Sequence, residues 1–179
     1  MTTLVNVCLS IFVIAAALRD GATHRIPNPL VLAGAATGVG LQSYYGGLPG
    51  LLESLEGLAV GLVIMLPFYI IRVMGAGDVK LMSAVGAFLG PTGVLGATLC
   101  SGIVGGLLAI GVAVYRRQFA RLLSNVWLVL VGSHAALEVG QLPTHARCRN
   151  SVGDLPYAVA IAFGVFAWLL YAHVQGAGR

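Results

Sequence analysis

The chain has 179 residues, of which 58% are hydrophobic and 9% are charged, and its formal net charge is +4. A typical soluble domain has about 45–50% apolar and roughly 25% charged residues, so the charges of this chain are too few to cover a water-soluble globule. The composition excludes a soluble cytosolic enzyme, a nucleic-acid-binding module and a disordered chain, and it predicts an all-α polytopic membrane protein.

Apolar segments predict six transmembrane helices in a single domain over residues 1–179, because a membrane-spanning helix needs about 20 apolar residues. The first segment has no Lys or Arg before its apolar core, and Arg19 follows the core. This order favours a retained first span with its N-terminus outside over a cleaved signal peptide. The expected spans are 3–19, 29–45, 54–72, 78–90, 93–115 and 154–174.

The fourth and fifth expected spans come from one continuous apolar tract, residues 79–115. A single helix over this tract would be about 55 Å long, whereas the hydrocarbon core of a bilayer is about 30 Å thick. The segment Gly90–Gly93, with the sequence Gly-Pro-Thr-Gly, is a turn signal inside the tract. It predicts a hairpin whose first arm is short.

A long segment, residues 116–153, joins the fifth and sixth expected spans on the inner side. Its apolar residues recur at helical spacing over 117–132, which predicts an amphipathic helix lying flat on the inner membrane surface. A seventh span over 119–139 is the alternative. With six spans, all of the ten basic residues except Arg179 fall on the inner side, as the positive-inside rule expects.

Two acidic residues lie at span ends that this topology places on one face. Asp20 ends the first span and Asp78 begins the fourth, and two crossings separate them, so both lie on the inner face. Two carboxyl groups that approach closely cannot both ionise, so one can take a proton from water while the other donates a proton to a carbonyl oxygen. The pair is therefore a candidate for general acid–base hydrolysis of an amide. The alternatives are a solvated helix-boundary residue for Asp20 and a helix N-cap for Asp78.

The residues around Asp78 are unusual for a helix start. Gly75 and Gly77 come just before it, and glycine lets an extended peptide or a neighbouring helix approach closely. Lys80 lies two residues on and points away from Asp78 in a helix, where it can reach a lipid phosphate or hold the backbone of a substrate.

Prolines stiffen the entry to the second span. Pro27 and Pro29 flank Asn28, and proline keeps the residue before it out of helical conformation. We expect this segment to fix the loop that carries Asp20. The alternative is an ordinary membrane re-entry turn with a proline in the first helical turn.

These segments resemble the type IV prepilin peptidases, a family of bacterial membrane aspartic peptidases. Residues 75–81, Gly-Ala-Gly-Asp-Val-Lys-Leu, resemble the signature Gly-x-Gly-Asp-x-Lys-Leu in full. Residues 17–20, Ala-Leu-Arg-Asp, followed by Arg-Ile-Pro-Asn at 25–28, resemble the segment around the first family aspartate. Residues 155–161 resemble the opening of the last span, with Ala158 where the family often has glycine.

The resemblance implies a catalytic pair formed by Asp20 and Asp78, in a bacterial inner-membrane protein of type IV pilus or type II-like secretion systems. The substrate would be a prepilin or pseudopilin, cut at the cytoplasmic face between its short basic leader and its apolar helix. No metal, organic cofactor or nucleic acid is implied. The residues expected to shape the site or to bind substrate are Gly75, Gly77, Lys80, Pro27 and Asn28.

The longer family members carry an extra cytoplasmic region with Cys-x-x-Cys pairs and also methylate the new N-terminus. The three cysteines of this chain, Cys8, Cys100 and Cys148, form no such pair. The chain therefore resembles the short, cleavage-only peptidases of tight-adherence (Flp) pilus systems, and methyltransferase activity is not expected.

Two other functions remain open on the sequence alone. A small proton-coupled membrane transporter would also hold acidic residues inside the membrane, but spread through its thickness. A non-catalytic pilus-assembly component would use the two aspartates only to cap helices. The second reading predicts that neither aspartate is needed for leader removal.

Overall fold

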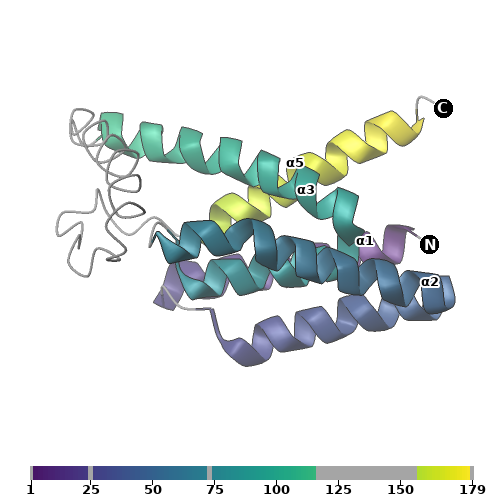
Figure 1. Ribbon diagram of the computed structural model, residues 1–179. Coiled ribbons are helices and arrows are strands. Elements are labelled where there is room, and N and C mark those ends of the chain that lie inside the picture. The colour runs from purple at the N-terminus through teal and green to yellow at the C-terminus, as the bar shows by residue number, and fades with distance from the viewer. Residues whose placement is uncertain (1, 24–25, 72–73, 116–156, 178–179) are drawn as a thin grey trace, which may run out of the picture. The chain divides into compact units, whose positions relative to one another are not determined.

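The computed structural model describes residues 2–23, 26–71, 74–115 and 157–177. These residues form four helices and no strand: α1 (Thr2–Thr23), α2 (Asn28–Ile70), α3 (Ala76–Tyr115) and α5 (Tyr157–Ala177) (Figure 1). All four are long and apolar enough to cross a membrane, so over the described residues the chain is all-helical, as predicted, and has the helices of a membrane protein. The expected amphipathic helix over 117–132 and the alternative span over 119–139 lie outside the described residues.

The prediction of six separate helices is not supported, because the described part of the chain contains four. The second and third expected spans form one 43-residue helix, α2, and the fourth and fifth form one 40-residue helix, α3. The reason is that the chain changes direction at a single residue in each helix. Gly47 (φ 60°, ψ −143°) and Gly90 (φ 70°, ψ −179°) have non-helical dihedral angles, while the residues on both sides stay helical.

Proline residues follow both of these glycines. Pro91 comes directly after Gly90, and Pro49 comes two residues after Gly47. Proline has no N–H to donate and its fixed φ suits the first turn of a helix. Each direction change therefore needs no separate loop: glycine supplies a backbone conformation closed to other residues, and proline starts the next helical arm.

Glycines bring the backbones of α2 and α3 into contact. A Cβ atom added at Gly57 would overlap the carbonyl oxygen of Gly86, and one added at Gly86 would overlap the carbonyl oxygen of Gly57. A Cβ at Gly61 would lie 2.7 Å from the Met82 carbonyl oxygen. Small residues that allow such an approach stabilise membrane helix pairs by van der Waals packing, because the lipid removes the hydrophobic driving force.

Serine hydroxyls add hydrogen bonds across the same interface. Ser54 Oγ on α2 donates to the Ala87 carbonyl at 2.7 Å, and Ser83 Oγ on α3 donates to the Leu58 carbonyl at 2.8 Å. All four residues are buried or half-buried. Each helix therefore donates one serine hydrogen bond to a carbonyl of the other. These bonds fix the position of α3 along α2, and with it the position of the start of α3.

The helix α1 packs against both α5 and α2. Leu9, Val13 and Ala16 of α1 are fully buried, and Phe12 stacks on Phe88 of α3 with ring centroids 5.9 Å apart. Large apolar side chains on the outer faces of the helices remain exposed, as expected for surfaces in contact with lipid; among the most exposed are Leu18, Leu32 and Leu99.

The chain divides into two compact units, residues 1–105 with 156–179 and residues 106–155. The first unit contains all of α1, α2 and α5 and most of α3. The described part of the second unit, residues 106–115, is the C-terminal end of α3. The expectation of one domain over 1–179 stays a prediction.

Candidate active site

Asp20 lies near the C-terminal end of α1 and is buried, with 8% of its surface exposed. Its Oδ2 accepts a hydrogen bond from the backbone N–H of Ala158 at 3.2 Å. Ala158 is the second residue of α5, and the first N–H groups of a helix have no partner within the helix. A carboxylate there also interacts favourably with the positive end of the helix dipole. Asp20 is therefore not a solvated boundary residue.

Asp78 lies in the first turn of α3 and is buried to the same extent, 8% exposed. Its Oδ2 accepts the backbone N–H of Gly75 at 3.3 Å, and its own N–H donates to the Gly75 carbonyl at 3.2 Å. A carboxylate that reaches back from the third helical residue to the N–H just before the helix is half of a capping box. Asp78 thus makes a helix-capping contact, and its carboxyl group is held in one place by it.

The two carboxyl groups lie close enough for their charges to interact. The start of α5 is near both, because the Tyr157 side chain interacts electrostatically with Asp78 while the next residue, Ala158, binds Asp20. The C-terminal end of α1 and the N-terminal ends of α3 and α5 therefore meet at one site. The chain brings together two carboxyl groups from helices that are distant in sequence.

The two predicted glycines have different surroundings. Gly75 is exposed, and a Cβ added there would lie 3.4 Å from Asp78 Oδ2. A Cβ at Gly77 would touch the Ile26 side chain at 3.4 Å. Gly77 therefore lets the start of α3 pack against Ile26, in the segment before α2. Gly75 has no side chain, so none covers the surface beside the Asp78 carboxylate.

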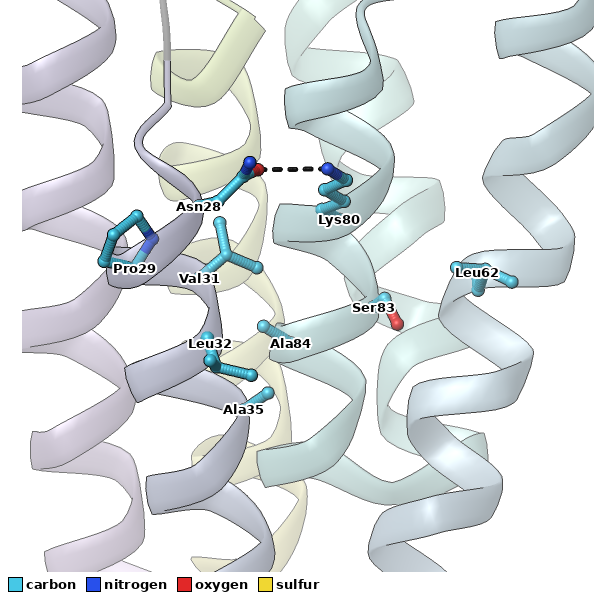
Figure 2. Close-up of a pocket in the computed structure, with 9 residues that line it drawn as sticks. All are labelled: Asn28, Pro29, Val31, Leu32, Ala35, Leu62, Lys80, Ser83 and Ala84. Atoms are coloured by element: carbon cyan, nitrogen blue, oxygen red, sulfur yellow. Dashed lines mark hydrogen bonds between the residues drawn. The ribbon is translucent and has the colours of Figure 1, made fainter.

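Asn28 and Lys80, which the sequence singled out separately, are partners. Lys80 Nζ donates to Asn28 Oδ1 at 3.0 Å, and both residues are exposed (Figure 2). Pro27 is extended (φ −64°, ψ 131°), and its carbonyl accepts the N–H groups of Leu30 at 3.1 Å and Val31 at 3.3 Å. Pro27 thus ends the preceding segment and starts α2, which gives Asn28 its position opposite Lys80.

Tyr157 and the Ala158 N–H were not among the predicted site residues. The only signal for them was the resemblance of residues 155–161 to the opening of the last family span. A contact across 138 positions leaves no local pattern in a single sequence. In the described ranges, no three His, Cys, Asp or Glu side chains gather in a way that could hold a metal ion.

Comparison with known protein families relates the chain to a described family. A family model described as the type IV leader peptidase family matches residues 7–110, a range that holds both aspartates and most of α1 to α3. No curated protein and no solved structure matches the chain.

Proposed function

Because this chain belongs to the type IV leader peptidase family, we propose that it is an aspartic endopeptidase that removes the short leader of a prepilin or pseudopilin at the cytoplasmic face of the bacterial inner membrane. The observation that carries the proposal is that two buried carboxyl groups, Asp20 and Asp78, lie beside the start of α5, close enough for their charges to interact. No organic cofactor or metal is required for this chemistry.

The proposed reaction is general acid–base hydrolysis of the scissile peptide bond. Two carboxyl groups at short range share one proton. The ionised group takes a proton from a water molecule as the water oxygen attacks the scissile carbonyl carbon, and the protonated group donates to the carbonyl oxygen. The gem-diol intermediate then collapses: one carboxyl group donates its proton to the leaving nitrogen as the C–N bond breaks, and the other takes a proton from a hydroxyl group as the C=O bond re-forms. The pair again holds one proton. The individual roles belong to the pair and are not divided between the two residues.

Access for the substrate is the second requirement. A helix in lipid has all of its backbone groups hydrogen-bonded, so a protease needs an extended segment at a place that water reaches. Both aspartates lie at helix ends, and the exposed Gly75 leaves the surface beside Asp78 without a side chain. We infer that the segment between leader and apolar helix passes over this glycine.

The site lies on the cytoplasmic side if each long helix crosses the membrane twice. A helix of 43 residues would be about 65 Å long if straight, about twice the hydrocarbon thickness. A Cβ at Gly50 would overlap the Gln42 carbonyl, a contact that needs the chain to reverse between these residues. We propose six crossings, with the reversals at Gly47 and Gly90 outside and Asp20 and Asp78 inside. The excess of basic residues on that side agrees with the positive-inside rule.

The cleavage-only, Flp-type assignment is part of the proposal. It rests on the absence of Cys-x-x-Cys pairs from the sequence. The transporter alternative is less well supported, because it calls for acidic groups distributed across the membrane rather than two carboxyl groups beside the same helix ends.

The test is co-expression with a Flp-type prepilin, followed by measurement of leader removal. Asp20→Asn and Asp78→Asn should each leave the prepilin uncut, while Glu56→Gln, an exposed acid on α2, should process it normally. Membrane abundance and thermal unfolding of each variant show whether it folds. Normal processing by either folded Asn variant would show that the pair is not catalytic.

A further inference from the structure

An open groove between α2 and α3 has a cationic end and an apolar wall. Its volume is about 470 Å³. Figure 2 shows Asn28 and Lys80 facing each other at one end, with Leu32 and Ala35 further along the helix that starts at Asn28 and Leu62 on a separate helix beyond Ser83. The two ends therefore differ in chemistry, and each restricts what the groove can hold.

The cationic end can bind an anion. The Lys80 ammonium group has three donors, and Asn28 Oδ1 accepts one of them at 3.0 Å. The Asn28 amide also has an NH₂ group, which can donate to the same anion. Lys80 lies near the start of a membrane-crossing helix, where a lysine side chain extends to the level of the lipid phosphates.

The apolar wall is open to lipid. Leu32 is 73% exposed and Leu62 is 40% exposed, so both apolar sides of the groove are open to the hydrocarbon of the membrane. A transmembrane helix is about 10 Å across, whereas this volume is of the size that holds a small molecule or a single chain. The groove therefore suits one acyl chain better than the apolar helix of a substrate.

A second groove on α2 has a similar composition. Arg19, Leu18 and Leu30 contribute to its lining, its volume is about 530 Å³, and Pro29 belongs to both grooves. Each groove thus combines one cationic side chain with apolar ones, beside the same end of α2. The presence of two such grooves supports a position at the membrane surface for the N-terminal end of α2.

We propose that the groove between α2 and α3 binds one anionic phospholipid. Its phosphate contacts Lys80 Nζ and the Asn28 amide, and one acyl chain lies along Leu32, Ala35 and Leu62. The acyl chain gains little by leaving a bilayer that is equally apolar, so selectivity comes from the charge of the headgroup. This proposal does not rest on the proposed cleavage reaction, although Asn28 and Lys80 lie beside the candidate active site.

The test is native mass spectrometry of the full chain released from nanodiscs that contain equal amounts of phosphatidylglycerol and phosphatidylcholine. The wild-type protein should retain mainly phosphatidylglycerol. Lys80→Gln should lower the retained ratio of phosphatidylglycerol to phosphatidylcholine about fivefold, the change expected for one basic side chain near an anionic surface. Lys80→Arg should keep the ratio, because arginine also binds phosphate.

Variants that fill the groove test the position of the acyl chain. Ala35→Trp should reduce retention of phosphatidylglycerol, and Leu62→Trp provides the same test at a more exposed position if Ala35→Trp does not fold. Leu99→Trp, which adds the same side chain at an exposed site of α3 outside the groove, should leave retention unchanged.

Three results would overturn the proposal. The first is equal retention of the two lipids by the wild-type protein. The second is an unchanged lipid ratio in Lys80→Gln. The third is unchanged retention of phosphatidylglycerol in the groove-filling variants combined with weaker binding of a prepilin helix peptide in phosphatidylcholine nanodiscs, which would assign the groove to the substrate. Loss of leader cleavage alone, with the lipid ratios as expected, would not affect the lipid site.

Discussion

The backbone N–H of Ala158 donates a hydrogen bond to Asp20 Oδ2 at 3.2 Å, across 138 positions of the chain. The same carboxyl group interacts with the charge of Asp78. Asp20 therefore has a structural contact with α5 and, in the proposed reaction, a chemical role. An experiment on Asp20 has to measure stability and cleavage separately.

The structural contact predicts different stabilities for two Asp20 variants. Asn keeps an oxygen that can accept the Ala158 N–H, whereas Ala removes the acceptor. Asp20→Ala should lower the free energy of unfolding by about 1 kcal/mol, the usual effect of losing a helix-capping side chain, and Asp20→Asn by clearly less. Thermal unfolding in detergent micelles measures both. Equal losses would show that the hydrogen bond contributes little.

The chemical role predicts a non-additive loss of activity. Each single Asn variant should lower the rate of leader cleavage by roughly 10²–10⁴-fold, as expected when a general acid or base is removed. The double variant should be no slower than the slower single variant, because groups that act as a unit lose their effect together. Single-turnover cleavage of a purified prepilin measures the rates. Multiplicative losses would mean that the two residues act independently.

The contact between Gly57 and Gly86 predicts strong sensitivity to a methyl group. Gly57→Ala and Gly86→Ala each place a Cβ on the carbonyl oxygen of the other glycine. The helices must separate to relieve this overlap, at a cost of about 1–3 kcal/mol. Gly40→Ala on α2 is the matched control, since its Cβ would meet no atom within 4 Å. The control should keep or raise the unfolding temperature, because alanine is the better helix former.

The chain reverses direction at Gly47 and Gly90, and replacing each glycine with alanine should lower the free energy of unfolding by a different amount. Both positions have positive φ in a region that is essentially restricted to glycine, so alanine should destabilise each by about 1–3 kcal/mol. At Gly90 the new Cβ would also lie 2.9 Å from Glu53 Oε1, whereas Gly47 has open space. Gly90→Ala should therefore cost more, and adding Glu53→Ala should recover the difference. Chemical or thermal unfolding of the wild type, the two single glycine variants and the double variant measures these differences in stability. If Glu53→Ala recovers no stability, the whole loss in Gly90→Ala comes from backbone strain.

The sequence predicted the fold class and the family better than it predicted the helix boundaries. Composition and apolar length predicted an all-α membrane protein, and the motif around Asp78 predicted the family, which is confirmed. Six separate helices were wrong for the described residues, because a turn signal such as Gly90–Gly93 does not reveal that only one residue leaves the helical conformation.

The hydrogen-bond partners of the site residues could not be predicted from the sequence. Asn28 and Lys80 were each identified from local patterns, but their hydrogen bond depends on how α2 and α3 pack. The role of Ala158 is carried by a backbone N–H, which no side-chain pattern can indicate. The catalytic assignment of Asp20 and Asp78 stays a prediction until cleavage is measured.

The crossed serine hydrogen bonds between α2 and α3 restrict how the site can open. A slip of one helical turn, about 5.4 Å, would take Ser54 and Ser83 away from the carbonyls of Ala87 and Leu58 and would press side chains against the facing glycines. The interface therefore has a single register. A slide of α3 along α2 is therefore opposed. If the proposed cleavage requires the carboxyl groups to move apart, displacement of α1 or α5 breaks neither of these hydrogen bonds.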